Sequence, residues 1–304
     1  MRARSGARPL WKSPIWRRQC GAAYLFILPA MMILLTFIIY PTFRVFILSF
    51  TSENWLGRPA RFVGFDNYTF LLSTSAFIRS LEATVRFSVL GLVLQMGAAL
   101  MLAVLLVKGF RGEKFFRTIY FIPVTMSLVV TSLLWRMLYN MNLGLFNNVL
   151  VHFGFMRQHF LSSMEQALPG VVVTYAWKTF GFYMMIFIAG LKGIPPELYE
   201  SAMIDGANAW QRFVRITLPL LKRTTLFVFV IGSINIIAKS IVPVFTMTWG
   251  GPRGTTTTTI FYIWQEAFNR MEVGVASAAT VMLFFVVIVI TAMQFFLGDR
   301  DNTK

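Results

Sequence analysis

The sequence predicts an all-α integral membrane protein with six transmembrane helices and both termini in the cytoplasm. Of its 304 residues, 57% are hydrophobic and 13% are charged, and the mean hydropathy of +0.66 is too high for a soluble domain of this length. Six apolar runs are each long enough to cross a bilayer, which takes roughly 20 helical residues. The runs are continuous rather than alternating in polarity, so they predict helices and not the strands of a transmembrane barrel.

Six segments are predicted to span the bilayer. They lie at about residues 22–48, 83–107, 118–140, 169–191, 224–248 and 275–297. The first run could be the hydrophobic part of a signal peptide, but it is longer than such a part usually is and no small-residue cleavage site follows it. We therefore expect it to be a permanent span.

The basic residues mark the predicted cytoplasmic side. The formal net charge is +16, which in a soluble chain would suggest a nucleic-acid partner. Here Lys and Arg gather before the first run, between runs two and three, and between runs four and five, whereas the alternate loops hold few. By the positive-inside rule these three regions are cytoplasmic. We therefore expect no nucleic acid and a chain embedded in the lipid bilayer, with contacts to anionic headgroups.

The chain divides into a membrane core and short flanking segments. A basic cytoplasmic tail occupies residues 1–20, and the first span with an outer loop occupies 21–80. The core, 81–297, holds the other five spans and a cytoplasmic loop at 192–223. A cytoplasmic tail follows at 298–304.

Few residues outside that loop suggest chemistry. Cys20 is the only cysteine, which excludes an intrachain disulfide, a redox pair and a cysteine-based metal site. His152 and His159 lie seven positions apart in an outer loop and are interpreted as solvated, so no metal site is predicted. The threonine run at 255–259 is interpreted as an extended segment that leads to a helix cap.

The most informative segment is the polar loop Ile194–Arg223, between predicted spans four and five. Pro195–Pro196 suits the first turn of a helix, where a missing N–H leaves no bond unmade. Glu197 and Glu200 then lie near the positive end of the helix dipole. Asp205–Gly206 ends the helix, because glycine readily adopts the left-handed conformation found there. The loop therefore predicts a short helix from Glu197 to the Asp–Gly pair.

A second helix is predicted to follow and to lie against the membrane. Its apolar residues recur at i, i+3, i+4 and i+7, which places them on one face; they are Trp210, Phe213, Val214 and Thr217. Pro219 then redirects the chain toward the fifth span. The first short helix is thereby held out from the membrane, a shape suited to docking in a groove. On composition alone, the alternative is a solvated loop whose acids balance nearby Lys and Arg.

This loop resembles the cytoplasmic signature of the membrane subunits of binding-protein-dependent ABC importers. The signature reads E-A-A, three residues, G, nine residues, I-x-L-P. Here it stands as Glu200-Ser201-Ala202, then Gly206, then Ile216-Thr217-Leu218-Pro219, with both spacings intact. Ser201 replaces alanine at the second position, which is a change between small residues.

Further segments are similar to the carbohydrate branch of the family, of the maltose-permease first-subunit type. Phe62–Tyr68, reading FVGFDNY, looks like the FVGxxNY segment that follows the first helix there. Leu134–Arg136 with Leu143–Asn147, and Gly250–Pro252, are similarly placed features. Trp249 stands where a glycine is common.

The resemblance implies a type I ABC importer permease fold in the inner membrane, beside a second, homologous permease. Two copies of an ABC ATPase would lie below the pair and an extracytoplasmic solute-binding protein above it. The short helix would be the coupling helix, seated on the ATPase. The residues assigned to ATPase coupling are Glu197, Tyr199, Glu200, Ser201, Ala202, Met203, Asp205, Gly206, Ile216 and Pro219.

ATP hydrolysis is expected in the partner and not in this chain. The sequence has no G-x-x-x-x-G-K-[ST] phosphate-binding loop. No cofactor is therefore expected here, and ATP and Mg²⁺ would bind to the partner ATPase. Closure of that ATPase would rock the paired permeases from an inward-facing to an outward-facing state.

Two lysines lie inside predicted spans, Lys178 in the middle of the fourth and Lys239 in the second half of the fifth. A charge at the bilayer centre costs about 2.5–3.5 kcal/mol on insertion scales, so each should face a cavity or a partner. Tyr175, Lys178 and Phe182 share a helix face on which aromatic rings beside a donor would suit a sugar. Asn235 is a further path candidate. The alternative is that the lysines cap carbonyls, snorkel or pair at a subunit interface.

The predicted function is import of a sugar, whether a mono-, di- or oligosaccharide. One alternative is a permease of the same superfamily for glycerol-3-phosphate or another polyol or small solute. A different class is an ion-coupled secondary transporter, but the spans show no obvious inverted repeat and no mid-membrane Asp or Glu. A membrane scaffold without transport would not need lysines deep in the bilayer.

Overall fold

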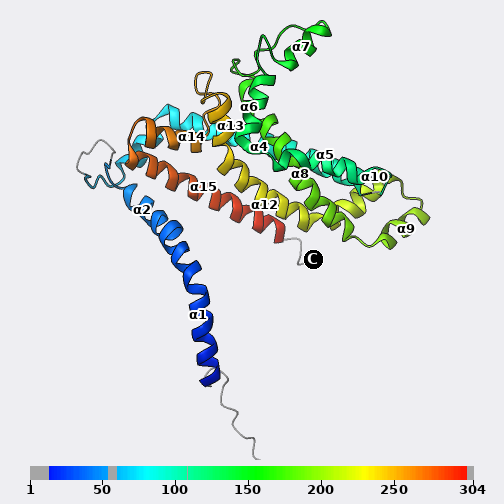
Figure 1. Cartoon of the computed structure of the whole chain (residues 1–304), viewed down its shortest axis with the longest axis horizontal. Coiled ribbons are helices and arrows are strands. Elements are labelled where there is room, and N and C mark those ends of the chain that lie inside the picture. Colours follow the sequence, from blue (N-terminus) through cyan, green and yellow to red (C-terminus); the bar gives the residue numbers. More distant parts are fainter. Residues whose placement is uncertain (1–13, 54–59, 108, 300–304) are drawn as a thin grey trace, which may run out of the picture.

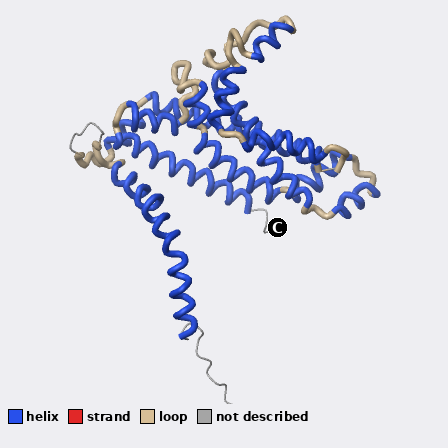
Figure 2. The backbone as a smooth tube through the Cα atoms, in the orientation of Figure 1, coloured by secondary structure: helices blue, strands red, loops and turns tan. Residues whose placement is uncertain are grey.

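The computed structural model describes residues 14–53, 60–107 and 109–299. Figure 2 shows helices joined by loops throughout these ranges. Within them the one β contact is an isolated bridge between Thr51 and Phe62. The prediction of an all-α chain is confirmed.

The elements follow the predicted runs and loops in order. They are α1 (Pro14–Leu34), η2 (Leu35–Ile39, a π-helix), α2 (Tyr40–Leu48), α3 (Asp66–Ser73), α4 (Ser75–Leu106), α5 (Glu113–Thr125), α6 (Leu128–Leu138), α7 (Leu145–His152), α8 (Ala167–Lys192), α9 (Pro196–Ile204), α10 (Ala209–Arg212), η3 (Phe213–Thr217, a π-helix), α11 (Leu218–Leu220), α12 (Lys222–Lys239), α13 (Ile241–Met247), α14 (Thr259–Trp264), η4 (Gln265–Asn269, a π-helix) and α15 (Val273–Asp299).

Five stretches are long and apolar enough to cross a membrane, and they correspond to five of the predicted runs. They are Ala23–Leu48, Ser75–Leu106, Ala167–Lys192, Lys222–Met247 and Val273–Phe296. The second begins before the predicted residue 83. The boundary expected between residues 80 and 81 therefore falls inside α4.

The third predicted run, 118–140, is not one straight span. α5 and α6 pass the length and composition test together, but they meet at a bend of 100°. The first helix ends just after Pro123, which has no N–H to donate, and Met126 and Ser127 take extended backbone conformations. Among the described residues there are thus five apolar spans, or six if the bent pair counts as one.

The first span stands apart from the other helices. Figure 1 shows α1 extending away from the helical body, to which α2 connects it. Its most apolar stretch is 0% buried. α2 packs on α15, where the Phe46 ring meets Phe284 and Phe285 edge-on at centroid distances of 5.7 and 6.4 Å. A bare apolar helix of this kind needs lipid or another chain around it.

The body is built around α4 and α8, which pack along each other, with α5 and α12 beside them and α15 packed on α12. Phe87 of α4 and Tyr175 of α8 are fully buried, with ring centroids 5.9 Å apart. α5 approaches α8 closely at Gly181, because any side chain there would collide with the Tyr120 carbonyl. A second buried cluster lies toward α9 and includes Phe187 of α8.

Buried asparagines support the loops at the end of α8 remote from α9. Asn67 donates to the carbonyls of Ser49 and Thr51, each at 2.9 Å, and so ties α3 to the end of α2. Asn147 donates to the Gln158 carbonyl at 3.0 Å and accepts from the Gln158 N–H at 2.7 Å. Both asparagines belong to segments on which the family resemblance rests. These segments therefore brace the loops.

The threonine run acts structurally, as predicted, although the cap differs. Thr258 precedes α14 but forms no side-chain cap. Instead, the Thr84 hydroxyl of α4 accepts the Thr259 N–H at 2.7 Å, and both side chains are buried. The Ser240 hydroxyl donates to that of Thr258 at 3.1 Å. The run thus links α14 to α4 and to the junction of α12 with α13.

Candidate functional site

The predicted short helix is present as α9, between Pro195 and Asp205 as its caps. Gly206 takes a φ of +78°, in the left-handed region. Its N–H donates to Met203 O at 3.1 Å, and the Ala207 N–H donates to Ala202 O at 2.9 Å. These two bonds form a Schellman motif, which satisfies carbonyls that the helix end would leave unpaired.

One side of α9 is anchored to the helical body. The Tyr199 hydroxyl lies 2.9 Å from the Thr217 hydroxyl, and Thr217 is buried. The Tyr199 side chain also packs against the buried cluster that contains Ile194 and Leu221. Residues from both ends of the 192–223 loop therefore meet in one packed unit with α4, α8 and α12.

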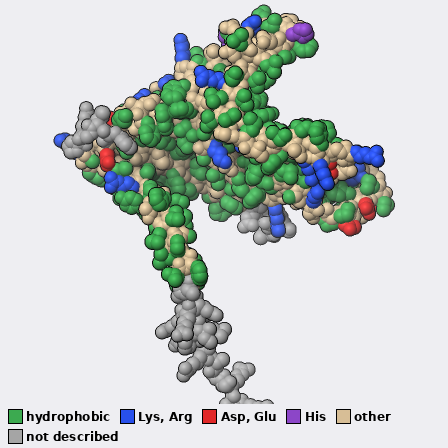
Figure 3. Space-filling view, viewed as in Figure 1, with side chains coloured by type: hydrophobic (Ala, Val, Ile, Leu, Met, Phe, Trp, Pro, Cys, Tyr) green, Lys and Arg blue, Asp and Glu red, His purple; other side chains and the backbone are tan. Residues whose placement is uncertain are grey.

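The other side of α9 is exposed and carries both apolar and acidic residues. Leu198, Met203 and Ile204 are 44%, 52% and 88% exposed. Glu197 and Glu200 are exposed, as are Ser201 and Asp205, and within the described ranges none of the three carboxylates forms an ion pair. Figure 3 shows acidic side chains gathered at the end of the body that carries α9. Exposed apolar groups beside these carboxylates favour a docking surface over a solvated loop whose acids are balanced by nearby Lys and Arg.

Ile204 was not among the predicted coupling residues, yet it is the most exposed apolar side chain of α9. The prediction rested on the motif positions, and Ile204 lies between them. An apolar residue beside the Asp–Gly helix end was the available signal. Of the remaining motif residues, Ala202 and Ile216 are half-buried and Pro219 is exposed.

The second predicted helix forms, but the prediction that its apolar residues share a single face is wrong. α10 begins with an unpredicted capping box, in which Asn208 and Gln211 each bind the other's backbone N–H, at 2.9 and 2.8 Å. The π-helix η3 follows and has more residues per turn than an α-helix, so positions i and i+7 no longer align. Trp210 is 70% exposed, whereas Thr217 is buried against α9.

The two membrane lysines lie on different helices, Lys178 on α8 and Lys239 on α12. Lys178 is half-buried and donates from Nζ to the Val124 carbonyl at 3.0 Å. Lys239 is exposed at the end of α12. The carbonyl bond agrees with one alternative for Lys178, that it caps a backbone carbonyl. That carbonyl belongs to the last turn of α5, before the 100° bend.

The other path candidates are divided between core and surface. Tyr175 is fully buried against Phe87, whereas Phe182 is 43% exposed and packs beside Tyr183 at a centroid distance of 5.4 Å. Tyr175 and Phe182 therefore do not share one exposed face with Lys178. Asn235 is half-buried on α12. A role for these residues in a substrate path stays a prediction.

Uncharged polar residues inside the spans were missed by sequence reasoning, which considered mainly charges. Gln95 of α4 is fully buried and accepts from the Thr179 hydroxyl of α8 at 2.9 Å. Gln294 of α15 donates to the Ser233 hydroxyl of α12 at 2.7 Å. A glutamine inside an apolar run needs such a partner, because water cannot reach it. These bonds join α4 to α8, which carries Lys178, and α15 to α12, which carries Lys239.

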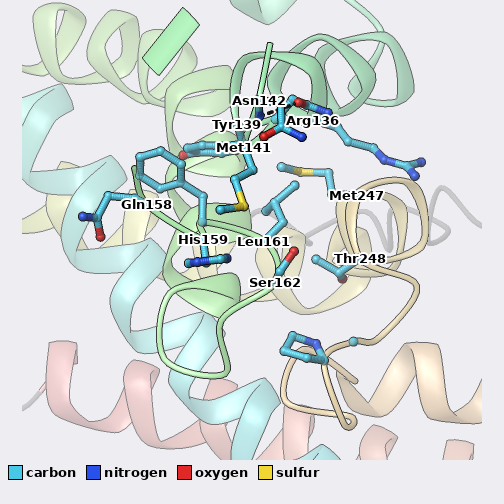
Figure 4. A pocket seen from close by; sticks show the side chains of 14 residues that line it. Arg136, Tyr139, Met141, Asn142, Gln158, His159, Leu161, Ser162, Met247 and Thr248 are labelled. Carbon is cyan, nitrogen blue, oxygen red and sulfur yellow. Dashed lines mark hydrogen bonds between the residues drawn. The ribbon is translucent and has the colours of Figure 1, made fainter. Parts of the chain in front are cut away.

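A cavity of about 500 Å³ lies near the start of α8, at the end of that helix away from α9. Figure 4 shows its side chains coming from the end of α6 and the following loop, from residues 158–162 and from the end of α13. Arg136 at its edge donates to the Thr246 carbonyl at 3.2 Å. His159, predicted to be merely solvated, is exposed and lines this cavity.

These features are typical of a membrane transport subunit. They are apolar spans around a buried core, a short exposed helix on a long loop, and charged side chains inside two spans. The chain belongs to the family of binding-protein-dependent transport system inner membrane components, which it matches over residues 95–300. It is therefore a permease subunit of an ABC importer. The family assignment made from the signature of the 192–223 loop is confirmed.

Two relatives of known name cover nearly the whole chain. The sn-glycerol-3-phosphate transport system permease protein UgpA of Rhizobium meliloti is 34% identical over 272 residues, which are 90% of this chain and 92% of the relative. UgpA of Escherichia coli O157:H7 is 33% identical over 291 residues, 96% of each chain. The glycerol-3-phosphate branch, which the sequence offered as an alternative, is thus well represented among the relatives.

Solved structures support the same fold. A chain in the crystal structure of a bacterial ABC transporter that imports the acidic polysaccharide alginate superposes with a TM-score of 0.83 at 26% identity, covering 95% of this chain and 99% of that one. In the complex of bacterial alginate ABC transporter with a periplasmic protein bound to an alginate pentasaccharide, the TM-score is 0.85 at 26% identity, with 98% and 99% covered.

Proposed function

We propose that this chain is one of two homologous permeases in an ATP-driven importer of a sugar or sugar-like solute. A solute-binding protein delivers the solute, two ABC ATPase copies drive the cycle, and the permeases alternate between inward- and outward-facing states. ATP and Mg²⁺ bind to the ATPase and not to this chain. A second candidate substrate is sn-glycerol-3-phosphate, which the UgpA relatives favour.

The observation that carries the proposal is the two-sided character of α9. Its exposed side offers apolar residues and free carboxylates, which suit a groove with basic residues on an ATPase. Its inner side is bonded through Tyr199 to Thr217 and packed into the body. A push on α9 would therefore reach α8 and α12 through existing contacts, as a rigid coupling element requires.

A second permease is supported by the bare first span. The most apolar stretch of Ala23–Leu48 is 0% buried within this chain. A neighbouring permease would cover part of its apolar surface and would also cover exposed residues of the other spans. The relatives are named as permease proteins of a transport system, and the alginate complex includes a periplasmic protein.

The orientation proposed places both termini and α9 in the cytoplasm. The excess of Lys and Arg before the first span and around α9 supports this orientation. The far half of α15 lies beside the loop, since Gln294 lines the same cavity as Pro219 and Lys222. The C-terminal end of α15 and α9 would then be on one side of the membrane.

ATP-dependent uptake in proteoliposomes tests the proposal. The complex would be reconstituted from this chain, its permease partner, the ATPase and the binding protein. We expect the ATPase to co-purify with the permeases, and uptake to require ATP and to survive a protonophore. Uptake that a protonophore abolishes while ATP is irrelevant would identify an ion-coupled transporter, and a chain that moves no solute would be a scaffold.

A further inference from the structure

A cavity of about 270 Å³ is lined by three arginines. Arg79 comes from the first turns of α4, Arg253 from the loop between α13 and α14, and Arg270 directly follows η4. Among the described residues that line this cavity there is no aspartate or glutamate. Figure 1 shows α14 and α9 at opposite ends of the body, so the cavity lies at the end remote from α9.

Two of these arginines have no partner in the described ranges of the chain. Arg270 donates to the buried Glu266 carboxylate at 2.6 Å. Arg79 and Arg253 are exposed, and neither forms an ion pair or a side-chain hydrogen bond with another described residue. Both also line a neighbouring cavity of about 310 Å³ with Glu165, which forms no ion pair with either. The two cavities together, here called the arginine cleft, therefore carry positive charge that the described residues leave unpaired.

Membrane topology does not explain why arginines gather there. The predicted outer loops hold no lysine and six arginines, which are Arg58, Arg61, Arg79, Arg157, Arg253 and Arg270. Half of them line one cavity, although the positive-inside rule disfavours basic residues on this side. α4 has 32 residues, or about 48 Å at 1.5 Å per residue, against about 30 Å of hydrocarbon. Its predicted apolar run begins only at residue 83, so Arg79 lies outside the acyl chains.

The loop between α13 and α14 holds Arg253 in a fixed position. The Thr256 hydroxyl donates to the Gly251 carbonyl at 2.8 Å, and the Thr257 hydroxyl donates to the Gly250 carbonyl at 3.2 Å. Arg253 itself has a φ of 48°, a left-handed conformation that residues with a side chain seldom adopt. A loop braced in this way presents its charge without first having to be ordered, which lowers the cost of binding.

An exposed aromatic ring borders the arginines. Trp249 lines the cavity, is 51% exposed and packs on Phe245 with ring centroids 4.3 Å apart. Tryptophan and arginine are enriched at the hot spots of protein interfaces. A guanidinium group also binds a carboxylate through two parallel hydrogen bonds. The arginine cleft therefore fits the acidic surface of a protein better than it fits a free anion.

We propose that Arg79 and Arg253 bind aspartate or glutamate side chains of the solute-binding protein, with Trp249 packed against the same protein. The inference rests on the proposed function and adds the surface on which the binding protein docks. In the proposed orientation the end of the body remote from α9 is the outer end, where the binding protein delivers its solute. One of the superposable transporters forms a complex with a periplasmic protein.

Affinity of the solute-binding protein for the permease–ATPase complex tests the docking surface. The complex would be held in phosphatidylcholine nanodiscs and the affinity measured by surface plasmon resonance. We expect Arg79→Glu and Arg253→Glu each to weaken binding at least tenfold, whereas Arg79→Lys and Arg253→Lys should retain most of the affinity. Wild-type affinity should fall as salt is added, because salt screens exposed charges, and the glutamate variants should lose this dependence.

The matched control is Arg111→Glu. It makes the same charge reversal at an exposed position between α4 and α5, on the side that the proposed orientation places in the cytoplasm. We expect this variant to bind the solute-binding protein with wild-type affinity. Co-purification of the partner permease and the ATPase should be unchanged in all the variants, which shows that the complex still assembles.

Three results would overturn the inference. The first is wild-type affinity in both glutamate variants. The second is loss of the partner permease from those variants, which would assign the arginines to a subunit contact. The third is an affinity loss that appears only when the binding protein carries its solute, which would assign them to the solute. The proposed function fails on a different measurement, namely uptake of solute by the wild-type complex without ATP.

Discussion

The backbone at Gly206 has a φ of +78° and an N–H bonded to Met203 O. Proline cannot satisfy either condition, because its φ is near −65° and it has no N–H. We therefore expect Gly206→Pro to misplace the end of α9 and to uncouple ATP hydrolysis from transport. The ratio of solute moved to ATP hydrolysed in proteoliposomes should fall at least fivefold.

Gly154 provides a close control for that variant. It has a φ of +81°, open space around it and an N–H bonded to Val151 O at 3.0 Å, but it lies in the loop after α7. Gly154→Pro imposes the same backbone conflict far from α9. Equal coupling defects in the two variants would mean that general instability, and not the position of α9, is responsible.

The Glu200 carboxylate is exposed and forms no ion pair within the described residues. If it pairs with a basic residue of the ATPase, its removal should cost about 2 kcal/mol or more. We expect Glu200→Ala to weaken ATPase binding to the permease pair by tenfold or more, measured by titration of the detergent-purified subunits. Glu165→Ala removes an exposed carboxylate from the loop before α8 and should bind the ATPase normally.

Single residues differ in how well the sequence predicted them. Gly206 could be predicted because a helix stop depends on local backbone preference. The partners of Asn67, Asn147 and Gln95 could not, since each binds a residue distant along the chain. Trp249 has a φ of 54° at a position where the family commonly has glycine. The mismatch was visible in the sequence, but the left-handed backbone that favours glycine at this position was not.

Among the helices, the contact between α9 and η3 tests whether the 192–223 loop moves as a unit. Tyr199→Phe and Thr217→Val each remove one hydroxyl from a bond of 2.9 Å, worth about 1 kcal/mol net. We expect either variant to lower the coupling ratio while ATPase binding is retained. In a double-mutant cycle the two effects should not add; additive effects would show that the hydroxyls act separately.

The bond from the Thr259 N–H to Thr84 holds α14 against α4. Thr84→Val leaves that buried N–H unpaired, at a cost of about 1–3 kcal/mol. We expect a lower unfolding temperature for the purified permease pair, followed by tryptophan fluorescence. Thr118→Val is the comparison, because Thr118 is exposed and bonds only to the preceding turn of its own helix. Similar losses in both variants would contradict the assigned role of the α4–α14 bond.

Whole helices were predictable where hydropathy and local stop signals agree, as in α8, α9 and α15. The bend between α5 and α6 was not, because residues 118–140 stay apolar across it and hydropathy does not record backbone direction. The π-helix η3 was missed for a related reason. Its sequence repeats at α-helical spacing, and the wider turn is set by packing that places Thr217 against Tyr199.

For the molecule as a whole, orientation in the membrane can be measured with the single natural cysteine removed. In a Cys20→Ser background, Met156→Cys introduces a thiol in the loop after α7, and Arg111→Cys introduces one between α4 and α5; both sites are exposed. We expect a membrane-impermeant maleimide to label Met156→Cys in right-side-out vesicles and Arg111→Cys only after lysis. The reverse pattern would contradict the proposed orientation.

The two lysines inside the spans would make the protein responsive to voltage if they change depth during the transport cycle. A charge that moves through the full membrane potential changes in energy by about 2.3 kcal/mol per 100 mV. If Lys178 and Lys239 shift in depth as the helices rock, an inside-negative potential favours the state in which they lie nearer the cytoplasm. The resting potential of the cell would then set how often the empty importer faces each side, before any solute or nucleotide binds.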